Sequence, residues 1–338
     1  MKATQERKVS ALKIGTLWLM LLAALAAMSV VALAVGSAGY SVVEILRALF
    51  SGEKSTVRVI GMNLRLPRLL LAIMIGASLS AAGALLQSVM RNPLADPGTI
   101  GVSAGAGTAA TTILLLFPAM TNAVPLFAFG GAALACFLIY SMAWKGGVDP
   151  VRIILSGVAI NAVLGAYNSL LQMLHSDSLE GVLAFMNGSL SGRSWVQVRT
   201  LALYAGIGLV LAFLCIKSAN ILQLGDEMAK SLGVKVNLCR VCLSAVSAFL
   251  AAATVSVAGM IGFVGLVVPH IARLLVGSDY KAMLPTSVLL GALVLLTADT
   301  VGRTVVPGME IPVGIVMSVT GGPFFLYMLR KKGNVRGY

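Results

Sequence analysis

The sequence predicts an all-α membrane protein, a polytopic bundle of ten transmembrane helices. The chain of 338 residues is 58% hydrophobic and only 11% charged, and its mean hydropathy is +0.95. Uncharged runs of about 20 residues recur along it, which is the length that crosses a hydrocarbon core as a helix. The strands of a membrane barrel would alternate apolar and polar residues, and these runs do not. The 36 glycines suit close packing between helices in lipid.

Charged residues divide the chain into its crossings. The uncharged run between Arg68 and Arg91 is long enough for one crossing, and the run at 97–144, interrupted near Pro118 and Pro125, is long enough for two. A stretch at 241–269 is long for one crossing and tight for two. Single crossings are expected at 14–43, 153–174, 200–216, 282–298 and 311–329.

The two tails decide the ambiguous stretch. The tails at 1–13 and 330–338 are rich in Lys and Arg, and the positive-inside rule places both in the cytoplasm. This arrangement requires an even number of crossings, so we predict ten, with two in 241–276 and a short second one. The whole chain would then form a single transmembrane domain, 1–338. The turn between the two crossings would contain three glycines: Gly259, Gly262 and Gly265.

The first run has a second interpretation. Residues 15–36 could be a cleaved signal peptide that ends at the Ala-x-Ala of Ala32 and Ala34. However, the uncharged stretch from Ile14 to Val43 exceeds the apolar length of a signal peptide. A retained first crossing is therefore favoured.

This topology puts most of the 25 Lys and Arg residues in the tails or in cytoplasmic connections. Arg65 and Arg68 lie outside, near the start of a helix, where the helix macrodipole disfavours cations. We therefore expect a compensating anion close to them. Asp299 lies four residues before Arg303 and is expected to pair with it. The basic residues expected outside are Arg47, Lys54, Arg58, Arg65, Arg68, Arg193, Arg199 and Arg303.

Composition disfavours several classes of function. The net charge is +13, but the basic residues cluster between apolar runs, which is typical of membrane anchoring and not of nucleic-acid binding. Cys239 and Cys242 form a Cys-x-x-Cys without further ligands nearby, so no metal site is predicted. The sequence has no Gly-x-x-x-x-Gly-Lys-Ser/Thr, so no ATP or other cofactor is expected on this chain. The crossings also hold few of the ionisable groups that ion-coupled carriers use.

If ATP drives the protein, a separate ATPase must act on a cytoplasmic connection, and the longest of these is the loop at 217–237. Its stretch LQLGDEMAKSLGV predicts a short helix bracketed by Gly225 and Gly233. Two interpretations stay open for this helix, which either lies on the lipid surface or docks into a partner protein. Helical spacing puts three apolar side chains on one face: Leu224, Met228 and Leu232.

Further stretches carry a resemblance to a known family. They are LRLPRLLLAIMIGASLSAAGALLQSVMRNPLADPGTIGVSAGAG at 64–107, GDEMAKSLGV at 225–234, and the later GMIGFVGLVVPHIARL, LLTADTVGRTV and EIPVGIVMSVTGGPFFLYML. Together they resemble the FecCD-type permease family, the membrane subunits of ATP-binding cassette importers for iron–siderophore complexes, haem and vitamin B12. The resemblance implies a type II importer permease in a bacterial cell membrane, a transport subunit and not an enzyme.

The resemblance also implies partners and site residues. The partners are a second permease subunit, identical or paralogous, two cytoplasmic ATPase subunits that bind ATP and magnesium, and an extracytoplasmic binding protein that delivers a metal chelate. Arg65, Arg68 and Arg303 match basic residues that receive acidic side chains of the binding protein. The segment that couples to the ATPase comprises Gly225, Asp226, Glu227, Met228, Ala229, Leu232 and Gly233.

The stretch RNPLADPG is interpreted as a turn near the cytoplasmic gate, formed by Asn92, Pro93, Asp96 and Pro97. Proline cannot continue a helix but suits its first turn, so Pro93 would end one helix and Pro97 would begin the next. Asp96 would cap the second helix.

Three questions stay open at this level. A secondary carrier or a channel without an ATPase is the alternative function, and the nearly charge-free crossings disfavour it. An intramembrane enzyme is unsupported, because no catalytic pair of residues lies within the crossings. The cargo is unspecified, with an iron–siderophore complex favoured over haem or cobalamin. His175 and His270 are expected to be structural or, for His270, related to coupling, and neither is expected to bind a metal.

Overall fold

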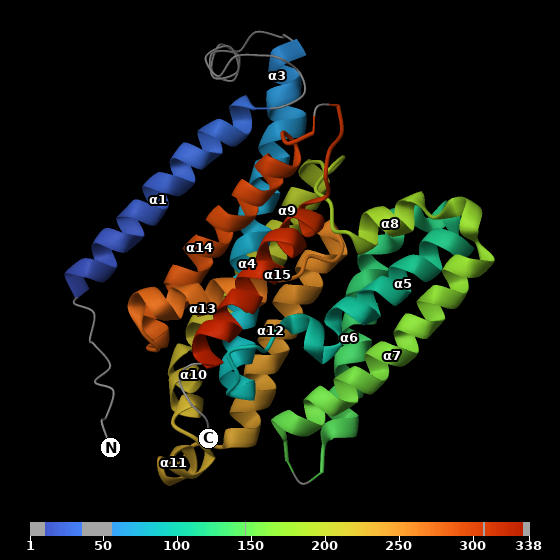
Figure 1. The fold of residues 1–338 in the computed structure, drawn as a ribbon. Helices are drawn as coiled ribbons and strands as arrows, with labels where there is room; N and C mark the ends of the chain where they lie inside the picture. Colours follow the sequence, from blue (N-terminus) through green and yellow to red (C-terminus); the bar gives the residue numbers. More distant parts are fainter. Residues whose placement is uncertain (1–10, 36–55, 146, 307, 334–338) are drawn as a thin grey trace.

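A computed structural model describes residues 11–35, 56–145, 147–306 and 308–333, and these form helices and no strand (Figure 1). Seven of the helices are long and apolar enough to cross a membrane, and three shorter apolar helices accompany them. Together they match the ten predicted crossings. Their bounds are α1 (Ala11–Ala34), α4 (Leu66–Met90), α5 (Val102–Leu116), α6 (Val124–Ala143), α7 (Pro150–Leu174), α9 (Trp195–Leu214), α12 (Val236–Ala258), α13 (Val264–Val276), α14 (Tyr280–Gly302) and α15 (Val313–Gly333).

Short helical elements join these crossings at the two ends of the bundle. We call the ends the α3 end and the α11 end, after the short helices at the top and bottom of Figure 1. The connecting elements are α3 (Thr56–Ile60), the π-helical η1 (Gly61–Arg65), the 3-10 helices η2 (Pro97–Ile100), η3 (Pro118–Ala123) and η4 (Ser176–Ser178), and the α-helices α8 (Glu180–Met186), α10 (Ile216–Gln223) and α11 (Asp226–Ser231).

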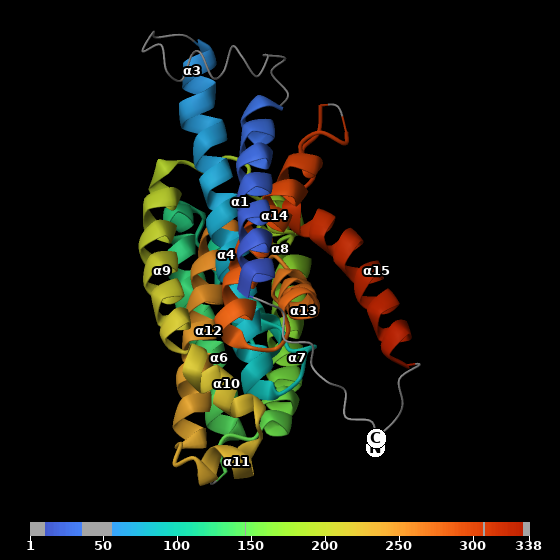
Figure 2. The same ribbon diagram turned by 90° about the vertical axis from the view of Figure 1, so that its left-hand side faces the viewer.

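Helix α4 is the buried axis of the bundle. It packs against α9, α12, α13 and α14, and most of its membrane-crossing window is buried (Figures 1 and 2). Side chains on neighbouring helices donate hydrogen bonds to its backbone. The Ser247 hydroxyl donates to Ala82 O, and the Tyr280 hydroxyl donates to Ala84 O. Because lipid offers no partners for polar groups, such bonds must be made inside the protein.

Polar side chains of the crossings join one helix to another. The amide of Gln87 in α4 donates to the carbonyl oxygens of Gly265 and Leu266 in α13. Asn168 in α7 donates to the Thr108 hydroxyl in α5. These residues hold the bundle together and are not arranged as an ion-binding site.

The predicted double crossing within 241–276 is confirmed. Helix α12 ends where Gly259 takes a φ of +74°, and an extended turn leads into α13. A positive φ is strained for residues with a Cβ, so glycine suits this position. Helix α13 has only 13 residues, which matches the short second crossing. Gly265 lies inside α13, beyond the turn.

Three pairs of glycines let helices approach until their backbones touch. They are Gly76 with Gly291 between α4 and α14, Gly83 with Gly265 between α4 and α13, and Gly105 with Gly131 between α5 and α6. A methyl group placed on any of them except Gly265 would lie under 3 Å from the facing backbone, and on Gly265 it would lie 3.1 Å from Leu79 O. The expected use of glycine for close packing in lipid is therefore confirmed.

The structure differs from the sequence analysis in three local respects. The stretch predicted as a loop at 217–237 is largely helical, because α10 follows α9 after Cys215. Helix α4 ends at Met90, before Pro93, with Arg91 as its cap in the left-handed conformation. The short helix α8, which lies outside every predicted crossing, packs against α5 (Figure 1).

Gly131 and its neighbour Gly130 provide a matched test of this packing. A Cβ at Gly131 would meet Gly105 O at 2.4 Å, whereas a Cβ at Gly130 would meet nothing within 4 Å. We predict that Gly131→Ala lowers the free energy of unfolding by about 1–3 kcal/mol, as overpacking does, and that Gly130→Ala does not lower it. Thermal unfolding of the two purified variants measures the difference. Equal stability would show that α5 and α6 do not meet through this glycine pair.

Candidate functional site

The predicted docking arginines lie in one charged cluster at the α3 end. Arg68 in α4 forms a bidentate interaction with Asp299 in α14, with donor–acceptor distances of 3.0–3.1 Å. It also pairs with Glu310 at 2.7 Å. The Asp299 side chain is 1% exposed, and two arginines supply the counter-charge that a buried carboxylate needs. The anion expected beside Arg68 is therefore within this chain.

Arg303 and Arg65 hold the end of α1. Arg303 pairs with Asp299 at 3.3 Å, which confirms the predicted i,i+4 pair. Its guanidinium also donates to Ala32 O and Val35 O, and Arg65 donates to Leu33 O and Ala34 O at 2.6 and 2.8 Å. The last carbonyls of a helix lack partners within the helix. Arg65 in η1 and Arg303 after α14 satisfy several of those of α1. The predicted helix start at Arg65 and Arg68 is wrong, because α3, η1 and α4 follow one another without a break from Thr56 to Met90.

The cluster keeps a net positive charge. Three arginines, Arg65, Arg68 and Arg303, face two carboxylates, Asp299 and Glu310, so the formal sum is +1. Glu310 is the most exposed of the paired groups, at 42%. Partial burial opposes its ionisation, but the hydrogen bond and charge of Arg68 outweigh this, so the pKa of Glu310 is lowered. Docking of a partner here stays a prediction.

The predicted coupling segment forms the short helix α11 at the opposite end. Gly225 and Gly233 bracket it with φ values of +97° and +76°, as the sequence predicted. Ala229 is fully buried against the bundle. The apolar face is turned outward, and its three members are 58%, 55% and 57% exposed: Leu224, Met228 and Leu232.

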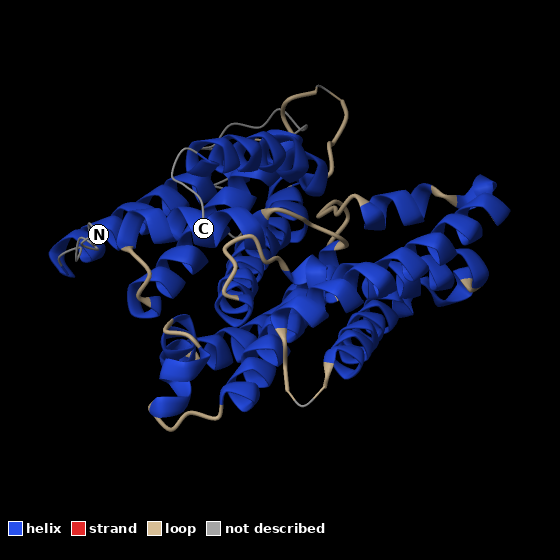
Figure 3. Cartoon of the chain, turned by 60° about the horizontal axis from the view of Figure 1, so that its bottom comes forward, coloured by secondary structure: helices blue, strands red, loops and turns tan. Residues whose placement is uncertain are grey.

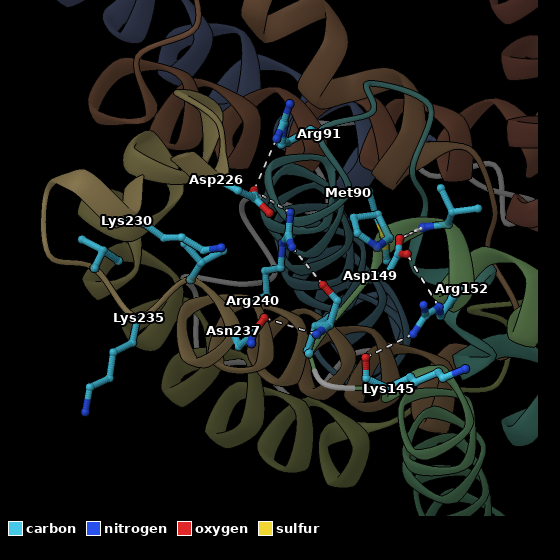
Figure 4. A pocket seen from close by; sticks show the side chains of 16 residues that line it. Met90, Arg91, Lys145, Asp149, Arg152, Asp226, Lys230, Lys235, Asn237 and Arg240 are labelled. Atoms are coloured by element: carbon cyan, nitrogen blue, oxygen red, sulfur yellow. Dashed lines mark hydrogen bonds and ion pairs between the residues drawn. The ribbon is translucent and has the colours of Figure 1, made fainter. Parts of the chain in front are cut away.

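Asp226 attaches α11 directly to two other parts of the bundle, and to a third through Arg240 (Figure 4). Its carboxylate pairs with Arg240 in α12 at 2.9 Å and with Arg91 at the end of α4 at 3.3 Å. Arg240 is buried and also donates to Val148 O in the connection between α6 and α7, at 2.8 Å. The sequence analysis named Asp226 but gave no sign of Arg91 or Arg240 as its partners, because they are distant along the chain. Charge complementarity alone cannot select one cation among many.

The predicted turn at 92–97 lies between α4 and η2. The Asn92 side chain accepts a hydrogen bond from Leu94 N at 2.9 Å, and Asp96 caps η2 by accepting from Gly98 N at 2.8 Å. Pro97 occupies the first position of η2, as expected. Burial raises the pKa of the Asp96 carboxyl, and the Gly98 hydrogen bond opposes the change.

One histidine is buried and the other is partly buried. His270 is buried in α13, and the His175 ring lies 3.2 Å from Leu171 O. In the part of the chain that the structure describes, no three side chains of His, Cys, Asp or Glu gather as a metal site. The four cysteines are free thiols.

The sequence analysis missed the junction around α8. There the connection after α8 meets the turn before α13 and the start of α15 through backbone hydrogen bonds. Ser189 N donates to Ala258 O, Met260 N to Phe185 O, and Gly314 N to Gly188 O. The glycines at this junction could have indicated it. A Cβ on Gly188 or Gly314 would collide with the facing backbone.

Comparison with known proteins agrees with this architecture. The sequence profile of the FecCD transport family matches residues 21–331. The Fe(3+)-citrate import system permease protein YfmD of Bacillus subtilis is 42% identical over 304 residues, which are 90% of this chain and 91% of that protein. The cobalamin import system permease protein BtuC of Halobacterium salinarum is 40% identical over 83% of this chain and 76% of that protein.

A third relative and a solved structure extend the similarity. The hemin transport system permease protein HmuU of Yersinia pestis is 37% identical over 90% of this chain and 94% of that protein. A solved structure of a metal-chelate type ABC transporter in an inward-facing conformation has a TM-score of 0.76 and 29% identity, and the match covers 94% of this chain and 99% of that one. The chain belongs to the FecCD transport family.

Proposed function

We propose that this chain is the permease subunit of an ATP-driven importer and that α11 receives the force of a separate ATPase. The outward apolar face of α11 is the observation that carries the proposal. Ala229 and Asp226 fix the helix to the bundle, so its three exposed apolar side chains point away from the chain's own core. Helix α11 lies at the extremity of the bundle (Figure 1), which favours a protein partner over the lipid surface.

The contacts of Asp226 offer a route from α11 into the crossings. A displacement of α11 acts on Arg91, which is followed at once by the turn at 92–97, and on Arg240 in α12. Through Val148 O, Arg240 also reaches the start of α7. Three crossings, α4, α7 and α12, are thereby connected to one surface helix.

Helix α7 offers a face for the second permease subunit. Little of its membrane-crossing window is buried within this chain. Small residues recur on its exposed face at helical spacing, among them Ala162, Gly165, Ala166 and Ser169. Small residues let helices approach closely in lipid. We infer that a second subunit, a copy or a paralogue, packs there and completes the translocation pathway.

The charges favour a membrane orientation with the α11 end in the cytoplasm. Fewer described basic residues lie at the α3 end than at the α11 end, and the positive-inside rule counts such residues near the helix ends. Both tails would then be cytoplasmic, and the ATPase, which binds ATP and magnesium, would meet α11. A binding protein would deliver the cargo at the α3 end. The basic residues at the α11 end include Lys13, Arg91, Lys145, Arg152, Lys217, Lys230, Lys235, Arg240, Arg273 and Lys281.

A metal chelate is the proposed cargo. The named relatives import iron citrate, cobalamin and haemin, and others import hydroxamate and achromobactin siderophores. Iron–siderophore and iron–citrate relatives recur among them, so an iron chelate is favoured.

We predict that uptake requires ATP and not an ion gradient. Proteoliposomes would contain the permease with its ATPase and binding protein, and the probes would be ferric citrate, a ferric hydroxamate, haem and cobalamin. Uptake of at least one probe should depend on ATP at the ATPase side and persist when a protonophore is added. The crossings hold few ionisable groups to bind a coupling ion. Uptake that stops with the protonophore at constant ATP would favour the secondary carrier.

We predict that Met228→Asp with Leu232→Asp abolishes ATPase docking. Two carboxylates buried without partners at a packed interface would cost several kcal/mol. The control, Met228→Leu with Leu232→Met, conserves volume and should behave as the wild type. The measurements are co-purification of the ATPase and stimulated ATP hydrolysis. Normal values in the Asp variant would mean that α11 lies on lipid.

We predict that Glu310 competes with the acidic side chain of a binding protein for Arg68. Glu310→Gln should raise binding-protein affinity up to about fivefold, since exposed pairs contribute about 0–1 kcal/mol, and Arg68→Gln should lower it. Glu180→Gln, at the exposed start of α8, is the control. Affinity is measured in nanodiscs at low and high salt. If Glu310→Gln leaves affinity unchanged, the arginines serve only to hold α1, α4 and α14 together.

A further inference from the structure

Two cavities lie near the α11 end, and the proposed function assigns a ligand to neither. The larger, of about 820 Å³, opens between the end of α4, the connection from α6 to α7, α11 and the start of α12 (Figure 4). The smaller, of about 350 Å³, lies between α6 and α12.

The larger cavity is strongly basic. Six cations and two carboxylates line it, which gives a formal charge of +4. Both carboxylates are already paired: Asp226 with two arginines, and Asp149 with Arg152 at 3.7 Å. Lys145, Lys230 and Lys235 make no ion pair with any residue that the structure describes. All three are labelled in Figure 4, where the Lys235 side chain extends away from Asp226 and Arg240. The cations are Arg91, Lys145, Arg152, Lys230, Lys235 and Arg240.

Two helices begin at this cavity, which adds to its positive potential. Helix α7 starts at Pro150, where Asp149 caps Val151 N. Helix α12 starts at Val236, and its cap residue, Lys235, makes no side-chain cap. A helix N-terminus carries a partial positive charge, so an anion in the cavity would be attracted by both the lysines and the helix ends. Arg240 is buried there, and its Nε has no hydrogen-bond partner in the described structure.

The smaller cavity is an apolar groove, and two of its lining residues are chain neighbours of residues that line the basic cavity. Trp144 and Val241 belong to its lining, and their chain neighbours Lys145 and Arg240 line the basic cavity. Phe137 and Trp144 are more than half exposed along the groove. Tryptophan is enriched at the membrane–water interface, and Trp144 directly follows α6, where that helix leaves the hydrocarbon.

We infer that an anionic phospholipid binds here, with its headgroup in the basic cavity and an acyl chain in the groove between α6 and α12. Basic pockets between transmembrane helices bind anionic headgroups. A free phosphate would be attracted to the lysines but would leave the apolar groove unused. The bound headgroup would lie beside Arg91 and Arg240, the two partners of Asp226. The inference goes beyond the proposed function and holds whether or not α11 binds an ATPase.

The test is native mass spectrometry of the purified importer titrated with phosphatidylglycerol or phosphatidylcholine. We expect the wild type to prefer phosphatidylglycerol. Lys145→Gln with Lys235→Gln should weaken that binding by roughly tenfold or more, since each basic residue near a membrane surface contributes about 1 kcal/mol. The matched control removes two charges at the same end outside the cavity, Lys217→Gln with Lys281→Gln, and should bind as the wild type does.

A second variant separates a lipid from a simple anion. Ala245 is exposed in the groove, so Ala245→Trp fills it while every charge is kept. It should weaken phosphatidylglycerol binding, and inorganic phosphate should not displace the lipid from the wild type. Thermal unfolding checks that the variants fold.

Three results would overturn the inference. In the first, the cavity variant and its control retain phosphatidylglycerol equally. In the second, Ala245→Trp has no effect and phosphate displaces the lipid, which would indicate a free-anion site. In the third, the cavity variant loses the ATPase while its lipid binding is unchanged, which would make the cavity a protein-docking surface.

Discussion

The hydrocarbon around this chain offers no hydrogen-bond partner, and the structure depends on how α4 meets that constraint. Every polar group on α4 must find its partner inside the protein. Its neighbours therefore approach closely, through glycines in α13 and α14, and side chains such as Ser247 and Tyr280 donate to its backbone. The remaining helices are arranged around this axis, which leaves α1 and α7 largely exposed to the surroundings.

The two ends of the bundle treat positive charge differently. At the α3 end the three clustered arginines have partners within the chain, namely two carboxylates and the last carbonyls of α1, and one positive charge remains. This arrangement fixes the outer ends of α1, α4 and α14 relative to one another. At the α11 end the lysines of the large cavity have no such partners among the described residues. At the α3 end most of the charges in the cluster are paired within the chain, whereas the α11 end holds a surplus of positive charge.

Asp226 joins the surface helix α11 to this second end. It shares its carboxylate between Arg91 and Arg240, so α11 is connected to α4 and α12 and, through Val148, to the start of α7. The proposed ATPase contact includes Met228, two residues after Asp226, and the proposed headgroup would lie beside Arg91 and Arg240, the partners of Asp226. A lipid headgroup beside Arg91 and Arg240 would compete with Asp226 for the same cations, so the two proposals involve the same set of charges.

The sequence by itself determined the number of crossings, the turn at Gly259, the short helix between Gly225 and Gly233, and the pair of Asp299 with Arg303. These features depend on local physics: the length of apolar runs, the φ values open to glycine, and spacing of three or four residues. Only the tertiary structure decided that Arg68 pairs with Asp299 and Glu310, that Arg65 holds the end of α1, and that Asp226 meets Arg91 and Arg240. These contacts join residues that are distant along the chain. Opposite charges attract whatever their separation in the sequence, so charge alone does not identify the partners. The packing of the helices around α4 therefore selects the partners that meet.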